Sequence, residues 1–146
     1  MFSEKRKFGN IGEEIIAKFL ANSGFEIIER NYLKRFGEID IVAKKDGAVH
    51  FIEVKSAWSG VSRETININF ENFTISLEND PCLFYGYLLE ENISANKKAR
   101  LARTIDLYLS EHKLHNSPFQ VDVAAVLIDF KSKCARVRYT DDVTLL

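Results

Sequence analysis

Two carboxylates and a lysine, Asp40, Glu53 and Lys55, are the residues of this sequence whose types and spacing suggest chemistry. Like charges that face each other across paired strands are destabilising, so a buried carboxylate pair needs a compensating partner. A shared proton is one such partner, and a divalent cation is a better one because hard cations take oxygen ligands. A lysine beside that cation could orient or deprotonate a water molecule.

The elements that must position these residues are two strands joined by a tight turn, between Gly37 and Lys55. The dipeptide Asp46-Gly47 is typical of a type I′ turn, which requires positive φ at both positions. The register that follows from this turn places Asp40 directly opposite Glu53. Because side chains alternate between faces, Asp40, Glu53 and Lys55 then share one face of the hairpin. Apolar residues at the alternate positions predict a buried opposite face: Ile39, Ile41, Ile52 and Val54.

An amphipathic helix is predicted from about Gly9 to Ser23, with Gly24 as its C-terminal stop. Its apolar face contains Ile11, Ile15, Ile16, Phe19 and Leu20. Glu14 lies nearly opposite that face and is expected in solvent. Glu13 lies at the edge of the face, from where it can reach a site at the margin of the sheet. The alternative for Glu13 is a plain first-turn glutamate, favoured by the helix dipole.

A second helix is predicted from about Ser94 to His112, with Ser94 as its N-cap. Its expected buried stripe contains Leu101, Ala102, Ile105, Tyr108, Leu109 and His112. The basic residues in its first turns, Lys97, Lys98 and Arg100, fit either a solvated helix face or contacts to phosphate near the acidic site.

The remaining segments predict an α/β fold with a mixed central sheet flanked by helices. Strands are expected at 25–33, at 121–130 and, as an edge strand, at 135–139. Alternation from Thr65 to Leu77 predicts an inserted β-hairpin that turns at Glu71-Asn72. The stretch 79–92 is apolar but irregular, and we expect it to pack on the body or form a partner surface. Asp122, at the start of a buried strand, is expected to form a structural salt bridge, with Lys97 as the candidate partner.

The length of 146 residues predicts one domain, 1–146, with a single modest core. The net charge of −1 means that nucleic-acid binding must rest on local patches. No apolar run is long enough to span a bilayer, and the first residues lack the apolar stretch of a secretory signal. Cys82 and Cys134 lie far apart without metal-site spacing, which indicates reduced thiols and a cytoplasmic protein.

The sequence contains four further motifs: Gly9–Ala17, Arg30-Asn31, Gly37–Ile41 and Phe51–Lys55, the last with Glu-Val-Lys. Together they resemble the YraN-like family of bacterial proteins, which is similar in fold to archaeal Holliday-junction resolvases and falls in the PD-(D/E)XK nuclease superfamily. The resemblance is dense over about 9–56. It is looser over about 93–130, where Lys97 and Val121-Asp122-Val123 match the family's later lysine and strand.

This resemblance implies a restriction-endonuclease-like core and hydrolysis of phosphodiester bonds in DNA, including structured DNA in repair or recombination. By the family pattern, Mg²⁺ or Mn²⁺ binds Asp40, Glu53, the Val54 carbonyl and the helix glutamate Glu13. Lys55 positions the water for in-line attack, so the implied catalytic residues are Glu13, Asp40, Glu53 and Lys55. Lys97, which matches the family's later lysine, and its neighbours Lys98 and Arg100 on the basic helix face are the expected nucleic-acid contacts. A homodimer is expected by analogy with the resolvases.

Two departures from the family pattern keep other functions open. The segment from about 59 to 92 is longer than usual, which indicates an insertion, and Gln120 stands where many relatives have arginine. Loss of that cation is expected to reduce phosphate contact. The alternatives are therefore a module of the same fold that binds nucleic acid without cutting it, or a protein-interaction module centred on the insertion.

Overall fold

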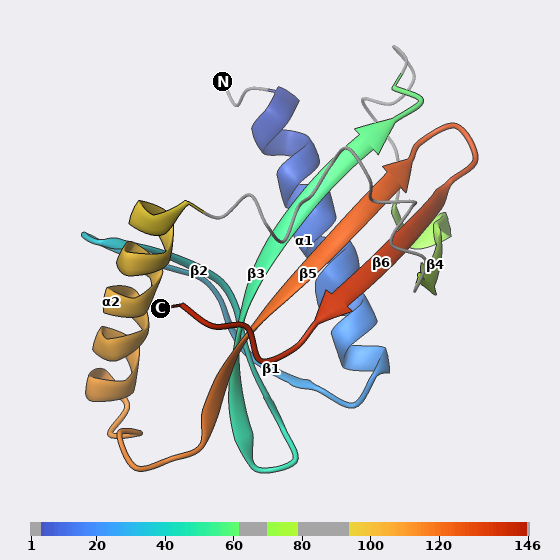
Figure 1. The fold of residues 1–146 in the computed structure, drawn as a ribbon. Coiled ribbons are helices and arrows are strands. Elements are labelled where there is room, and N and C mark those ends of the chain that lie inside the picture. The colour runs from blue at the N-terminus through green and yellow to red at the C-terminus, as the bar shows by residue number, and fades with distance from the viewer. Residues whose placement is uncertain (1–3, 62–69, 79–93, 146) are drawn as a thin grey trace.

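A mixed sheet with a helix on each face forms the described part of the computed structural model, residues 4–61, 70–78 and 94–145 (Figure 1). The elements in chain order are α1 (Glu4–Asn22), β1 (Glu26–Lys34), β2 (Gly37–Lys45), β3 (Ala48–Ser59), the short 3₁₀ helix η2 (Phe70–Asn72), β4 (Thr74–Leu77), α2 (Ala95–Glu111), β5 (Phe119–Asp129) and β6 (Cys134–Thr140). The strand order is β1-β2-β3-β5-β6-β4. The pairs β3–β5 and β4–β6 are parallel, and the others are antiparallel. The predicted α/β class with a mixed sheet is confirmed.

The hairpin of β2 and β3 has the predicted register over its first five pairs. Asp46 and Gly47 have φ values of 51° and 81°, as a type I′ turn requires. The ladder ends at Ile41–Ile52, and beyond this pair β2 is bonded only to β1. The two strands diverge there, as Figure 1 shows. Asp40 and Glu53 are therefore not ladder partners, and the prediction of direct pairing between them is wrong.

The core has two parts, one on each face of the sheet. Under α1, Ile15, Ile16 and Leu20 of the predicted apolar helix face pack on Ile41 and Ile52. Under α2, a second cluster contains Tyr32, Ile39, Val42, Phe51, Leu101, Ile105 and Tyr108. Ile39 was expected on the same face as Ile41, and it lies in the α2 cluster instead. The separation of β2 from β3 after Ile41 accounts for this difference.

Helix α2 begins and ends close to the predicted residues. The Ser94 hydroxyl accepts a hydrogen bond from the Lys97 N–H at 3.2 Å, which confirms the N-cap. The buried residues of the helix are Leu101, Thr104, Ile105, Tyr108 and Leu109. The prediction was wrong for His112, which is exposed at the C-cap, and for Ala102, whose place is taken by Thr104. The Thr104 hydroxyl donates a hydrogen bond to the Arg100 carbonyl at 2.8 Å, so this polar side chain can be buried.

Strand β6 is not an edge strand, because β4 pairs with its outer side. β4 corresponds to the second arm of the expected inserted hairpin, and η2 lies at the expected turn. The first arm, at 65–69, and the apolar stretch 79–92 lie outside the described residues. No helix in the described ranges is both long and apolar enough to cross a membrane.

Candidate functional site

The candidate site lies where β2 and β3 separate. There the Asp40 carboxylate takes the place of a backbone carbonyl of β2. Its Oδ2 accepts a hydrogen bond from the Val54 N–H at 2.8 Å. The side chain of Glu53 is 7% exposed, and the two carboxyl groups contact each other. Burial, followed by the charge of Glu53, raises the pKa of Asp40 to about 8, although the Val54 N–H opposes the shift. The raised pKa of Asp40 means that its ionised form is unfavourable here, and a bound cation would favour that form.

The main chain of β3 adds an oxygen to this position. In an antiparallel ladder the N–H and C=O of a residue point toward the same edge of the strand. Since the Val54 N–H points at Asp40, the Val54 carbonyl also faces the space left by β2. Two carboxylates and a carbonyl oxygen thus converge on one edge of β3, which is a donor set suited to a hard divalent cation.

Two lysines contact the acidic pair. Lys97 Nζ lies 2.8 Å from Glu53 Oε1, and Lys55 Nζ lies 3.6 Å from the same atom. Burial, followed by the contact with Lys97, lowers the pKa of Lys55. Burial acts in the same direction on Lys97, but its contact with Glu53 leaves the pKa of Lys97 raised. Lys97 therefore remains a cation, whereas Lys55 is the lysine that can more readily give up its proton.

Helix α1 brings Glu13 into this cluster. Burial and then the charge of Glu38 raise the pKa of Glu13, which also contacts Asp40. With its amide nitrogen turned toward the acids, Asn31 donates to Glu13 Oε2 and to Glu38 Oε1, at 3.0 Å each. Asn31 has a φ of 54°, a left-handed conformation that asparagine tolerates better than most residues. The structure thus brings together all four predicted site residues and adds Asn31 to them.

Gly12 allows α1 to approach closely enough for this contact. A Cβ atom at position 12 would lie 1.9 Å from Ser56 Oγ and 2.9 Å from Ser56 Cβ. The neighbouring Glu14 does not point freely into solvent as predicted. Its Oε1 lies 2.6 Å from Arg30 Nη1, because β1 passes under this side of the helix.

The acidic pair lies between two depressions that share Asp40, Glu53 and Lys97. The hairpin depression, of about 620 Å³, extends past Arg35 to the start of α2 and is also lined by Arg100. The central depression, of about 250 Å³, lies toward α1 and contains Glu13, Val54 and Lys55. Because the two share the same acidic side chains, an extended ligand can cross the site from one to the other.

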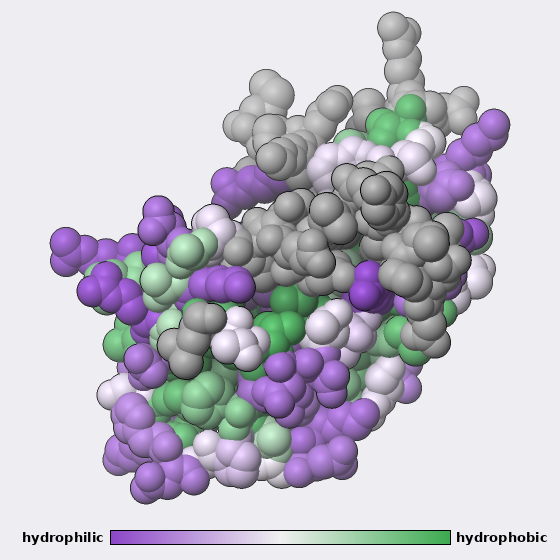
Figure 2. All heavy atoms as spheres, in the orientation of Figure 1, coloured by the Kyte–Doolittle hydropathy of each residue, from purple (hydrophilic) through white to green (hydrophobic). Residues whose placement is uncertain are grey.

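Exposed cations surround the hairpin depression. They are Lys34 and Arg35 at the tip of the β1–β2 hairpin, and Lys97 and Arg100 on α2. Figure 2 shows hydrophilic side chains gathered at this margin of the molecule. Arg100 Nε donates to the Phe36 carbonyl at 2.9 Å, which ties the hairpin tip to α2. Of the three predicted nucleic-acid contacts, Lys97 and Arg100 line the hairpin depression, whereas Lys98 lines neither depression.

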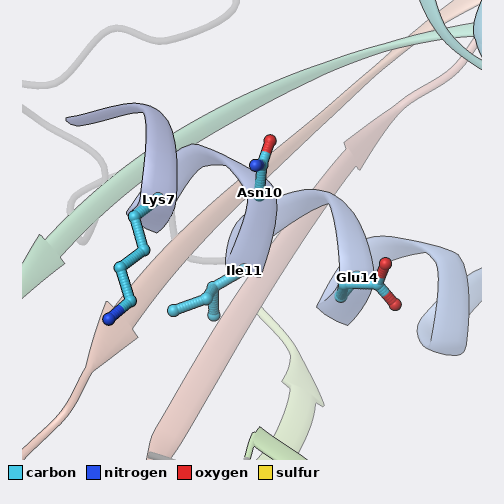
Figure 3. A pocket seen from close by; sticks show the side chains of 4 residues that line it. All are labelled: Lys7, Asn10, Ile11 and Glu14. Carbon is cyan, nitrogen blue, oxygen red and sulfur yellow. The ribbon is translucent and has the colours of Figure 1, made fainter. Parts of the chain in front are cut away.

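A third depression, of about 400 Å³, runs along α1 and is separate from the acidic pair. Its described lining residues are Lys7, Asn10, Ile11 and Glu14. Lys7 and Ile11 project to one side of the helix and Asn10 to the other (Figure 3). Glu14, its one described carboxylate, is engaged by Arg30. This hollow therefore lacks the paired carboxylates on which the candidate site rests.

Comparison with known proteins identifies the family. The model of the uncharacterised protein family UPF0102 matches residues 12–74, which include the four predicted site residues. A UPF0102 protein of Campylobacter lari is 34% identical over 139 residues, covering 95% of this chain and 89% of the relative. A UPF0102 protein of Campylobacter hominis is 37% identical over 120 residues, covering 82% and 83%. This chain belongs to the UPF0102 family. The resemblance to YraN-like proteins is thereby confirmed.

One buried carboxylate of this UPF0102 protein lies outside the candidate site. Asp122 is fully buried and takes no part in an ion pair with Lys97, contrary to the prediction. Its Oδ2 lies 2.6 Å from His50 Nδ1 and accepts a hydrogen bond from the Tyr139 hydroxyl. Its Oδ1 accepts from Gln120 Nε2 and from the Asp142 N–H, each at 2.9 Å. Gln120 therefore serves this buried network, and the prediction that it marks a lost phosphate contact finds no support in its position.

The partners of Asp122 were not identified from the sequence. His50 and Asp122 each occupy a strand position that is flanked by apolar residues and buried. A polar residue in such a position is the signal that could have identified the network. Polar residues at such positions need a hydrogen-bonding partner.

Among the described residues, no group of three or more His, Cys, Asp and Glu side chains has the arrangement of a closed metal site. The UPF0102 site instead offers two carboxylates and one carbonyl. Mg²⁺ commonly binds through one or two carboxylates, with waters and substrate phosphate completing its coordination. The donor set therefore fits an open Mg²⁺ or Mn²⁺ site better than a structural one.

Proposed function

We propose that this protein is a metal-dependent phosphodiesterase that cleaves nucleic acid, with DNA as the expected substrate. The observation that carries the proposal is the meeting of Asp40, Glu53 and the Val54 carbonyl on one strand edge, with Lys55 3.6 Å from Glu53. A buried carboxylate whose pKa is raised by burial and by an acidic neighbour is stabilised in its ionised form by a cation, so the pair is a good ligand for Mg²⁺ or Mn²⁺. The exposed cations around the hairpin depression suit a polyanion.

Each side chain has a distinct part in this proposal. Asp40, Glu53 and the Val54 carbonyl hold the cation, and Glu13 holds a water or a further coordination position beside it. A bound Mg²⁺ supplies charge neutralisation at the phosphodiester and a lowered pKa for water. Lys55, whose pKa is lowered by burial, accepts a proton from the attacking water or orients it. Lys97 leaves Glu53 for a phosphate oxygen when substrate enters.

A thermal melt with and without Mg²⁺ or Mn²⁺ tests the metal site. A ligand that binds only the native state raises its stability by about RT ln(1 + [L]/Kd), so the melting temperature of the wild type should rise. Asp40→Asn should abolish the rise while keeping an acceptor for the Val54 N–H. Asp46→Asn is the matched control, because it removes an exposed carboxylate from the turn of the same hairpin. If Asp40→Asn responds to the metal as the wild type does, the site is not where we place it.

Cleavage of linear, flapped and four-way DNA then tests the activity. We expect hydrolysis that requires Mg²⁺ or Mn²⁺ and is lost in Glu53→Gln and Lys55→Met. Lys18→Met is a control for loss of an exposed lysine on α1. Metal binding without cleavage of any of these DNAs, or of RNA, would contradict the proposed activity.

One observation favours a second function, nucleic-acid binding without cleavage. Lys97 already places a cation 2.8 Å from Glu53, so the ion pair can stabilise this carboxylate without metal. In that case binding should weaken with salt and with Lys97→Gln or Arg100→Gln. It should be indifferent to Mg²⁺ and to Lys55→Met, which distinguishes this function from hydrolysis.

A further inference from the structure

Trp58, the single tryptophan of the chain, lines two adjoining depressions at the end of β3. One is the central depression, which contains Glu53 and Lys55. The other, here called the distal depression, has a volume of about 480 Å³ and is also lined by Leu127 and Arg136. The path that enters at the hairpin depression and crosses the acidic pair therefore reaches Trp58.

The packing of Trp58 gives it a fixed position with part of its surface free. Its ring centroid lies 5.2 Å from that of Phe8, which in turn lies 5.1 Å from Phe130. Phe8 and Phe130 are buried, whereas Trp58 is only half-buried. An aromatic ring held from the core side and open to a groove is a suitable surface for another flat apolar group.

The edge of β3 between the acidic pair and Trp58 presents backbone donors. The ladder with β2 ends at Ile52, and the N–H groups of alternate residues then point toward the edge that β2 has left. Val54 uses its N–H for Asp40. By the same alternation, the N–H groups of Ser56 and Trp58 face this edge, where no strand of the described chain pairs with them. Such donors suit phosphate oxygens.

The faces of the sheet decide which groups can accompany the ring. Trp58 pairs with Ile128 of β5, and both side chains belong to the cluster under α1. Arg136 of β6 lies between Ala135 and Val137 of the same cluster, so its side chain projects from the opposite face. The groups beside the ring that can hold a phosphate are therefore the backbone N–H groups at the edge of β3.

Spacing connects the ring with the acidic pair. Trp58 follows Lys55 by three residues, or about 10 Å along a strand. Stacked nucleotides rise by about 3.4 Å each, so a base about two or three nucleotides from the scissile phosphate reaches the ring. Within a duplex, neighbouring base pairs cover both faces of a base, and only an unpaired or terminal base can stack on a side chain.

We propose that Trp58 is a stacking platform for an unpaired base, with the backbone N–H groups at the neighbouring edge of β3 as donors to its phosphate. The substrate class of the site is then nucleic acid with unpaired nucleotides on one side of the cleaved bond, rather than continuous duplex. This inference rests on the proposed phosphodiesterase function, and it assigns to Trp58 a binding role and no chemical step.

Intrinsic fluorescence tests the proposal directly, because the chain has one tryptophan. The full chain is titrated with single-stranded oligothymidylate and, separately, with a blunt duplex of equal length, in chelator so that no cleavage occurs. We expect saturable quenching by the single strand and protection of Trp58 from acrylamide, with little change on duplex addition. These readouts need neither metal nor cleavage, so failure of the hydrolytic proposal is distinguishable from failure of this one.

Two pairs of variants sharpen the test. Trp58→Leu should weaken single-strand binding, measured by fluorescence anisotropy of a labelled oligonucleotide, by about tenfold, which corresponds to about 1.4 kcal/mol. Phe119→Leu, which removes an aromatic ring that is 45% exposed and outside the depressions, should bind as the wild type does. Arg136→Gln, on the opposite face of the sheet from the ring, and Lys18→Gln, on α1, should both leave single-strand binding unchanged.

Equal quenching by duplex and single strand would overturn the proposal, as would wild-type affinity in a folded Trp58→Leu variant. If Trp58→Leu does not fold, the wild-type quenching and acrylamide protection decide the question alone.

Discussion

Two carboxylates, Asp40 and Asp122, lie in strands on either side of β3 and differ in how their charge is satisfied. Asp122 is fully buried and has four contacts with groups that can donate a hydrogen bond, two at each oxygen. Asp40 receives one backbone N–H and otherwise faces Glu53 and Glu13. The fold supplies donors to both oxygens of Asp122, whereas it supplies Asp40 with one backbone donor and two acidic neighbours.

This difference separates a structural acid from one that is available to a ligand. Burial contributes to the difference, because Asp122 is fully buried whereas Asp40 is half-buried and lines two depressions. The number of donors supplied by the fold also distinguishes them. Four predictions test this difference, in order of decreasing expected change in stability.

Removing the satisfied carboxylate should have the largest effect. Asp122→Ala leaves His50, Gln120 and Tyr139 without their buried acceptor, and we expect a loss of about 3–5 kcal/mol in the free energy of unfolding. Chemical denaturation measures this loss. Asp106→Ala, on the exposed face of α2, is the control and should change stability by less than about 0.5 kcal/mol. A mild effect of Asp122→Ala would mean that its contacts do not act as a network.

Moving the helix that carries Glu13 should come next. Gly12→Ala places a Cβ atom within 1.9 Å of Ser56 Oγ, so α1 or β3 must shift, at a cost of about 2–3 kcal/mol. Gly9→Ala is the matched control, since a Cβ atom there meets nothing within 4 Å. It should stabilise the helix by up to about 1 kcal/mol. Equal thermal stability of the two variants would contradict the close packing of α1 on β3.

Neutralising the unsatisfied carboxylate should stabilise the metal-free protein. The pKa of Asp40, about 8 in the folded state, exceeds the ordinary value of 3.8 that applies after unfolding. Its proton therefore stabilises the fold at low pH, and this contribution is lost as pH rises toward 8. In chelator, Asp40→Asn should gain about 1–2 kcal/mol over the wild type at pH 8 and almost nothing at pH 4. A stability loss at pH 8, measured by denaturant titration, would show that Asp40 is a structural acid like Asp122.

Removing one donor from Asp122 should have the smallest effect. Tyr139→Phe deletes a hydroxyl whose pKa is raised by burial and by Asp122, and we expect a loss of about 1 kcal/mol. Because the raised pKa keeps this hydroxyl protonated, the loss should stay constant between pH 6 and 9 within about 0.3 kcal/mol. A loss that disappears within this range would mean that the hydroxyl titrates there. Thermal melts across that range measure it.

The order and type of most elements could be predicted from the sequence, because they depend on local signals. Asp46-Gly47 determined the hairpin register, Ser94 the start of α2, and Gly24 the end of α1. The failures came from tertiary structure. The ladder between β2 and β3 stops after Ile41, and β4 covers the outer side of β6. The local sequence predicts neither the end of this ladder nor the pairing of β4 with β6.

The candidate site was predictable where it lies on one hairpin. Asp40, Glu53, Val54 and Lys55 are close in sequence, and strand alternation brings them near one another. The partner of Lys97 was mistaken, because the choice between Glu53 and Asp122 depends on how α2 docks on the sheet. The network of Asp122 joins β3, β5, β6 and the segment after β6, so its members are far apart in the chain.

Position 31 imposes two requirements on a single residue. Its backbone is left-handed, which costs most side chains about 1–2 kcal/mol, and its side chain must donate to two carboxylates. Glycine meets only the first requirement, glutamine only the second, and aspartate would add another negative charge to the acidic cluster. Several amino acids meet one of the two requirements, but among the common residues asparagine is the one that meets both. Sequence drift at this exposed position is therefore restricted by the geometry of Glu13 and Glu38, although Asn31 lies outside the core.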